Sequence, residues 1–143
     1  MVTRKDKTRR SACPISFALD ILGDKWTLLV VRDLVFAGKR HFRDFLNSPE
    51  GIASNILASR LRSLEARGIV SRRPDPESAR KVIYALRPKG IALVPLLLEL
   101  IRWGAAHDPK TAAPEDFIRR IVRDREGMIA EITAAIEKRR HPS

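Results

Sequence analysis

The stretch GIASNILASRLRSLEARGIVSRRPD (Gly51–Asp75) decides the fold of this chain. Because an α-helix advances about 100° per residue, apolar residues spaced three and four apart share one of its faces. Three leucines have this spacing: Leu57, Leu61 and Leu64. Gly68 is a typical stop after a helix, so the pattern predicts a helix from Ser54 to Arg67.

The opposite face of this helix carries short polar side chains and one arginine. Such a face suits a helix that enters the DNA major groove, about 12 Å wide, with its first residues near base edges. Asn pairs with adenine, Ser with donors or acceptors, and Arg with guanine or phosphate. The candidate DNA-reading residues are Ala53, Ser54, Asn55, Ala58, Ser59 and Arg62. An ordinary solvated helix face has the same appearance, so this face alone leaves both interpretations open.

The residues that follow predict an antiparallel hairpin. IVSRRP (69–74) and KVIYAL (81–86) read as strands, and DPESAR between them is rich in turn formers. Basic residues flank its tip: Arg72, Arg73, Arg80 and Lys81. In a DNA-binding protein these four residues would approach phosphates or the minor groove. Alternatively, they only protect a strand edge from aggregation. A polar helix and a basic hairpin together favour nucleic-acid binding.

The remaining elements complete a mainly α fold with a small β-hairpin. Residues 14–22 predict a helix that Gly23 ends, and Asp24 can cap a nearly wholly buried helix after it. HFRDFLN (41–47) predicts a short helix before the Ser54 helix. Helices, a short helix, a longer helix and a hairpin, in that order, describe a winged helix-turn-helix.

Two further helices are expected after the hairpin. One runs from Pro88 to about His107 with a kink at Pro95, which cannot donate a backbone hydrogen bond. The other runs from Glu115 to about Arg139 and carries a single apolar stripe. Such a stripe packs on its own domain or on a second subunit, and we favour a dimer.

Composition narrows the class of protein. The 143 residues include 28 Lys and Arg against 17 Asp and Glu, a net charge of +11, which favours a polyanionic partner and leaves DNA, RNA and anionic membranes open. The single cysteine excludes an intramolecular disulfide framework and suits a reducing compartment. No secretion signal is visible, and the apolar run from Ile91 to Ile101 is too short to span a bilayer. We expect a cytoplasmic protein without a membrane partner.

Catalytic, cofactor and metal sites find little support in the sequence. No nucleophile stands with a base, the glycines are dispersed, and the histidines lack partners at metal-ligand spacing, so we expect no enzyme, cofactor or metal. We expect Trp26 and Trp103 to pack in the core and at an interface rather than to line a ligand pocket. Arg32 and Asp33 are expected to form structural ion pairs.

An ordered set of short motifs carries a family resemblance. They are Cys13-Pro14, LGDKWTLLVVRDL (Leu22–Leu34), Arg40, Phe42, Phe45-Leu46, Gly51-Ile52, Leu57, RLRSLE (Arg60–Glu65), Gly68-Ile69-Val70, Tyr84, Leu86, Gly90, Leu97 and Trp103-Gly104. In these residues the chain resembles the HxlR-type winged helix-turn-helix regulators. The resemblance covers about residues 12–107. Members often have Ser at Ala53, a basic residue at Asn55 and Thr at Ala58. This chain therefore lacks the usual helix cap unless Ser54 takes that role.

The resemblance implies a homodimeric transcriptional regulator that binds a palindromic operator on double-stranded DNA, with terminal helices in the dimer interface. We favour a repressor over an activator. The expected organisation is a basic flexible arm (1–12), an HxlR-type DNA-binding domain (13–107) and a C-terminal dimerisation helix (114–140). The alternative is a winged-helix module that binds RNA or a protein partner without operator specificity.

Cys13 is a candidate redox sensor. It precedes Pro14 at a helix start with Arg9 and Arg10 nearby, features that favour a thiolate, and some members of the family sense oxidants near this position. A small structural thiol is the simpler alternative. The protein could therefore respond to a small molecule or an oxidant, but the sequence does not identify this effector.

Overall fold

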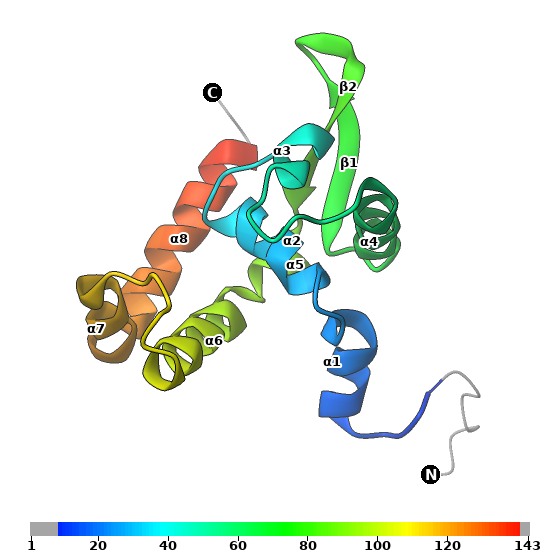
Figure 1. Cartoon of the computed structure of the whole chain (residues 1–143). Coiled ribbons are helices and arrows are strands. Elements are labelled where there is room, and N and C mark those ends of the chain that lie inside the picture. Colours follow the sequence, from blue (N-terminus) through cyan, green and yellow to red (C-terminus); the bar gives the residue numbers. More distant parts are fainter. Residues whose placement is uncertain (1–8, 141–143) are drawn as a thin grey trace.

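The computed structural model describes residues 9–140, which form eight helices and one two-stranded antiparallel sheet (Figure 1). The elements are α1 (Pro14–Leu22), α2 (Thr27–Val35), α3 (Phe42–Leu46), α4 (Ser54–Ala66), β1 (Val70–Asp75), β2 (Ser78–Leu86), α5 (Pro88–Ile91), α6 (Val94–His107), α7 (Glu115–Arg123) and α8 (Arg125–Arg140). Helices α2 to α4 and the hairpin form the predicted winged helix-turn-helix. Of the predicted flexible arm, residues 1–8 lie outside the described part, and residues 9–12 are neither helix nor strand.

The core lies between α2, α4, the base of the hairpin and α6. The leucine face of α4 is buried as predicted, and Leu57 is 0% exposed. It meets a buried face of α2, which includes Val31, and the buried residues of β2 and α6, among them Leu86 and Leu98. Burial of this leucine face fixes which side of α4 remains at the surface.

Asp24 joins the start of α2 to α4. Its carboxylate accepts hydrogen bonds from the backbone N–H groups of Trp26 and Thr27 and so holds the turn before α2, whose N-cap position is occupied by Trp26 instead of the predicted Asp24. It also accepts a hydrogen bond from Nε of Arg60 at 2.8 Å. Burial alone raises the pKa of Asp24, but the hydrogen bonds from Thr27, Trp26 and Arg60 together lower it below the ordinary value.

A second polar cluster holds the turn between α3 and α4 against α2. The Arg32 guanidinium donates two hydrogen bonds of 2.7 Å to the Glu50 carboxylate and a third to Asp33, which confirms the predicted structural role of Arg32 and Asp33. Asp33 is buried and also accepts hydrogen bonds from Lys39 and Ser48. These contacts hold the turn that precedes α4 in place on α2.

The helix expected over residues 88–107 is interrupted rather than kinked. Helix α5 ends at Ile91, and α6 starts at Val94 with Pro95 in its first turn, where a missing N–H group costs nothing. By length and composition this stretch is the one within residues 9–140 that could cross a membrane, a test that core helices of water-soluble proteins also pass. Val94, Leu97 and Leu98 are buried in the domain itself.

The single helix expected over residues 115–139 is two helices, which corrects the sequence-based prediction. The chain breaks at Asp124, whose carboxylate accepts a hydrogen bond from the N–H of Gly127 and so starts α8. The helices fold back on each other, and the apolar stripe is buried inside the subunit at Ile121, Met128 and Ile136. The stripe is therefore partly covered by the chain's own α6 and hairpin, while Val122 remains 62% exposed.

Candidate nucleic-acid interface

The predicted DNA-reading residues lie on the surface side of α4. Ala53, Ser54, Asn55 and Arg62 are exposed, while Ala58 and Ser59 are half-buried. Ala53 is the residue before the first helical turn and offers no side-chain hydrogen bond, and Ser54 does not replace it as a cap. The helix therefore starts with small groups only, which lets another molecule approach its backbone closely.

Arg60 lies beside the predicted DNA-reading residues, although the sequence pattern marks it only as part of a family motif. Its guanidinium bridges from α4 to Asp24 and donates a weaker hydrogen bond of 3.4 Å to the Ser59 hydroxyl. This places Ser59 beside a fixed positive charge and ties α4 to the start of α2. The two partners are 36 residues apart, so local sequence pattern carries no sign of the pair.

The hairpin separates the four predicted wing residues, of which Arg72 is exposed and pairs with Tyr84 within the regular part of the sheet. Beyond the pair Pro74–Val82 the register shifts, and the next pair is Asp75–Ser78, so Arg80 and Lys81 lie in an irregular segment near the tip. Both are exposed. Arg73 lies lower and faces the end of α8, where it donates a hydrogen bond to the Arg140 carbonyl oxygen at 3.3 Å. The tip thus carries two of the four predicted cations, and it projects beyond the body beside α3 (Figure 1).

His41 fastens the tip of the hairpin to the helix-turn-helix. It precedes α3, and its Nε2 lies 2.8 Å from Oδ2 of Asp75, the last residue of β1. Asp75 also accepts a hydrogen bond from the N–H of Glu77 in the turn. This backbone hydrogen bond first, and the His41 contact second, lower the pKa of Asp75.

We expect the contribution of Asp75 to stability to depend on pH. Because the folded-state pKa is below the unfolded value, the stabilisation is present above about pH 4 and is lost as the pH falls through the folded-state pKa. Asp75→Asn should therefore lower Tm most near neutral pH, and the difference from the wild type should shrink in acid. Thermal unfolding between pH 7 and pH 3 measures it, with the exposed Glu137→Gln as control. A difference that does not change with pH would exclude this role.

Cys13 is exposed and forms the residue just before α1. The two arginines expected to favour its thiolate have other contacts. The Arg9 guanidinium lies 5.4 Å from the centre of the Phe17 ring, and Arg10 pairs with Asp20 at 2.6 Å. Two features still favour a reactive Cys13 thiol: its position at the start of α1 and its exposure to solvent.

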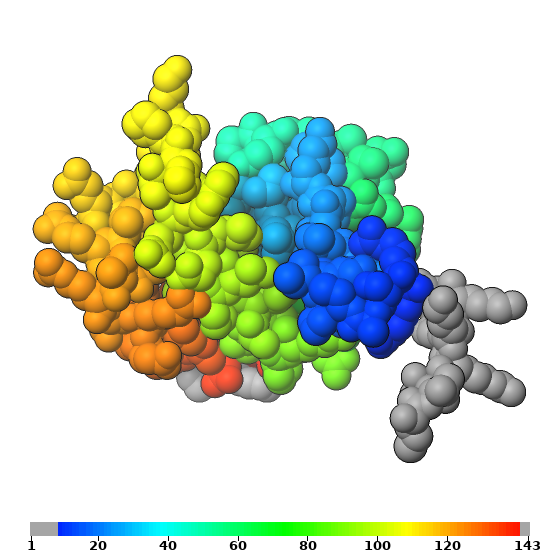
Figure 2. Space-filling model, turned by 90° about the horizontal axis from the view of Figure 1, so that it is seen from below, coloured from blue at the N-terminus to red at the C-terminus, as the bar shows by residue number. Residues whose placement is uncertain are grey.

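A face with exposed apolar side chains lies on α1 and α6, away from the hairpin. Helix α1 buries none of its residues fully, and Ile15 and Trp103 are 69% and 67% exposed. The other large apolar residues on these helices with high exposure are Phe17, Leu19, Leu96 and Leu100. Figure 2 shows both α1 and α6 exposed on this face of the molecule. Trp26 packs on the core as expected, whereas Trp103 does not.

An apolar hollow of about 450 Å³ lies between α2, α6 and the loop before α7. Its lining includes Leu28, Phe36, Leu97, Leu100 and Ala112. Leu100 belongs both to this hollow and to the exposed face of α6. Elsewhere in residues 9–140, no three His, Cys, Asp or Glu side chains are arranged to hold a metal ion.

The model of the HxlR-like helix-turn-helix family matches residues 21–112, well over half of the chain. The chain belongs to the HxlR family. Among its curated relatives, the uncharacterized HTH-type transcriptional regulator sll1512 of Synechocystis is 37% identical over 93 residues, 65% of this chain and 68% of the relative. HxlR proteins are DNA-binding helix-turn-helix transcription regulators rather than a family of enzymes.

Solved structures agree with this assignment. The crystal structure of PA1607, a candidate transcription factor, has a TM-score of 0.65 and 39% identity, and covers 74% of each chain. The redox regulator HypR in its oxidized form has a TM-score of 0.60 and 34% identity, and the match covers 67% of this chain and 98% of HypR. Helices α7 and α8 lie beyond the residues that the HxlR model matches.

Proposed function

We propose that this HxlR protein is a cytoplasmic homodimeric repressor that binds a palindromic operator and excludes other proteins from the promoter by steric competition. In each subunit α4 lies in the major groove, with Asn55, Ser59 and Arg62 near base edges. The tip of the hairpin, with Arg80 and Lys81, contacts the neighbouring backbone or minor groove.

The observation that carries this proposal is the contrast between the two faces of α4. One face is buried leucine, and the other combines small, uncapped first-turn residues with an exposed arginine beside a projecting basic hairpin. A structural helix has no need of a bare surface next to such a hairpin. The same combination supports readout of a duplex.

The test is selection of bound fragments from genomic DNA with the purified protein, followed by competition. Operator duplex should displace a labelled operator far better than random duplex of equal length, because specific binding exceeds non-specific binding by about 10³-fold or more. The selected sequence should contain inverted half-sites. Equal competition by structured RNA, or no enriched sequence, would favour the alternative of a module without operator specificity.

The apolar face on α1 and α6 supports the dimer. Monomeric proteins rarely leave several large apolar side chains exposed together, and a two-fold axis would place the same face of each subunit against the other. Ile15, Leu100 and Trp103 are its most exposed members on the two helices, together with Leu19. Because α1 buries none of its residues fully, whereas the stripe of α7 and α8 buries Ile121, Met128 and Ile136 within the subunit, we assign the main contact to α1 and α6 rather than to the predicted 114–140 segment.

Cys13 supports regulation by oxidants, as the similarity to the redox regulator HypR suggests. With one cysteine, its oxidation by diamide joins the thiol to a second copy or to a small thiol. We expect diamide to reduce operator binding of the wild type by at least about tenfold, and reductant to restore it. Cys13→Ser should bind the operator normally and ignore diamide. Equal loss of binding in both proteins, measured by gel shift, would reject Cys13 as the sensor.

A further inference from the structure

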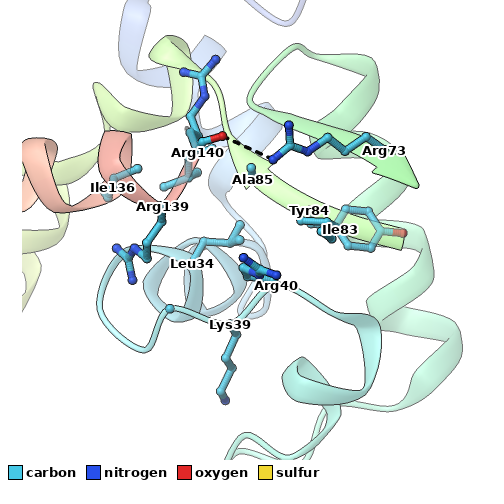
Figure 3. A pocket seen from close by; sticks show the side chains of 12 residues that line it. Leu34, Lys39, Arg40, Arg73, Ile83, Tyr84, Ala85, Ile136, Arg139 and Arg140 are labelled. Carbon is cyan, nitrogen blue, oxygen red and sulfur yellow. Dashed lines mark hydrogen bonds between the residues drawn. The ribbon is translucent and has the colours of Figure 1, made fainter. Parts of the chain in front are cut away.

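Four arginines from distant parts of the chain line a small hollow beside the base of the hairpin, and Figure 3 shows the Arg140 side chain extending outward from it. Arg40 comes from the connection between α2 and α3, Arg73 from β1, and Arg139 and Arg140 from the last turn of α8. We call these four residues the arginine cluster. Two of its members belong to α8, which lies outside the segment matched by the HxlR model.

Two hydrogen bonds hold the end of α8 in this position. Arg139 donates to the carbonyl oxygen of Val35 at 2.8 Å, at the end of α2. Arg73 donates to the carbonyl oxygen of Arg140 at 3.3 Å, at the end of α8. Each bond satisfies a carbonyl group that a helix end leaves without a partner. The arginine cluster is therefore fixed to both the helix-turn-helix and the hairpin.

No carboxylate of the described residues forms an ion pair with the arginine cluster, although Arg40 is close enough to Asp75 to help lower its pKa. Within residues 9–140, no Asp or Glu oxygen lies within 4 Å of a guanidinium nitrogen of the cluster. Other arginines of the chain do have such partners, for example Arg32 with Glu50 and Arg120 with Glu131. Like charges on one surface repel one another, so an anion that approaches this surface lowers their energy.

The size and place of the hollow indicate which anion. Its enclosed volume is about 30 Å³, room for a water or two, so it admits one group that reaches in from outside rather than a whole metabolite. The end of α8 lies at the same end of the molecule as α3 and the hairpin, opposite α1 (Figure 1). Figure 1 also shows α4 and the end of α8 on opposite sides of the hairpin, so a duplex held by α4 reaches this end only if it continues past the hairpin.

We propose that the arginine cluster binds backbone phosphates of the DNA next to the segment that α4 and the hairpin tip contact. The C-terminal extension then adds affinity without reading bases, because phosphate contacts position a protein and carry no sequence information. This inference rests on the proposed function. It assigns a DNA-binding role to Arg40, Arg139 and Arg140, and moves Arg73 from the hairpin tip to this second contact.

The double variant Arg40→Ala/Arg140→Ala tests the proposal. It removes two cations of the cluster but no side-chain hydrogen bond between residues 9 and 140, because the Arg140 carbonyl that accepts from Arg73 is part of the backbone. The matched control is Lys110→Ala/Arg123→Ala, which removes two exposed charges from the loop after α6 and from α7. Both variants have the same net charge, so any general electrostatic effect is equal in the two.

The measurement is the salt dependence of binding to the duplex that the wild type selects. The slope of log Kobs against log salt should become shallower by about 1 to 2 for the cluster variant and remain closer to the wild-type value for the control, since each phosphate contact contributes about 0.9. The difference should appear on a duplex that extends about half a helical turn beyond the core site and vanish on the trimmed core duplex.

Three results would overturn the inference. The first is an equal salt slope for the two double variants. The second is a change in slope that is the same on the trimmed and extended duplexes. The third is that inorganic phosphate stabilises the wild type but not the cluster variant, while the salt slope of DNA binding does not change. The last would identify a small-anion site. If the wild type itself selects no operator, the proposed function fails instead, and random duplex still reports whether the cluster contacts phosphate.

Discussion

Replacing Trp103 by glutamate should turn the protein into a monomer and weaken operator binding by roughly 10²–10⁴-fold. Trp103 is 67% exposed on α6, within the apolar face that we assign to the dimer. A carboxylate buried without a partner at a subunit contact is strongly destabilising, so the dimer dissociates. Each monomer then binds one half-site alone and loses the effective concentration that the linked second subunit supplies. Light scattering and gel shift measure the two effects.

Ala134→Glu is the control for this variant. It adds the same charge at an exposed position of α8, outside the proposed interface, and should leave both the dimer and operator binding intact. A Trp103→Glu protein that remains dimeric would move the interface away from this face. Circular dichroism of both variants should show unchanged helix content, because Trp103 contributes nothing to the buried core.

Arg62→Ala should weaken binding to the selected operator by about 1–3 kcal/mol, or roughly 5- to 150-fold, and relax sequence preference at one position of each half-site. The reason is the place of Arg62 two helical turns from Asn55 on the exposed face of α4, where a guanidinium can bond to a guanine edge. Binding to random duplex should change far less. Competition between operator and random duplex gives both affinities.

Arg80→Ala, at the hairpin tip, is the natural comparison for Arg62→Ala. A phosphate contact is lost equally on every sequence, so this variant should weaken operator and random binding by similar factors and reduce the salt slope by about 1. If the two variants behave alike, α4 and the hairpin do not divide base readout and backbone contact as proposed.

Local sequence pattern predicted those helices and turns that depend on one apolar helix face or on one residue at a helix end. Leucine spacing located α4, and Gly68, which has φ of +73°, marked the turn after it. Asp24 was recognised as a residue that holds the start of α2 because its partners Trp26 and Thr27 are two and three residues away, although Trp26 occupies the N-cap position itself. These features depend on neighbours in sequence, so the sequence contains them.

Features that depend on distant contacts could not be predicted. The pairs His41–Asp75 and Asp24–Arg60 join residues more than 30 positions apart, and nothing in the local pattern relates them. The break at Asp124 has a local signal, an aspartate three residues before Gly127, but the continuous apolar stripe concealed it. The DNA-binding roles of the α4 and hairpin residues stay predictions, since burial and exposure define a surface and not its ligand.

Methylation protection of the selected operator tests the central claim most directly, because dimethyl sulfate attacks guanine N7 in the major groove. If α4 lies in that groove, the wild type should protect guanines in two clusters about 10 base pairs, or a small multiple, apart. Protection should disappear at the Arg62 position in Arg62→Ala and persist in Arg80→Ala at saturating protein. Unprotected guanines throughout a tightly bound operator, or the same protection with Arg62→Ala, would contradict the account.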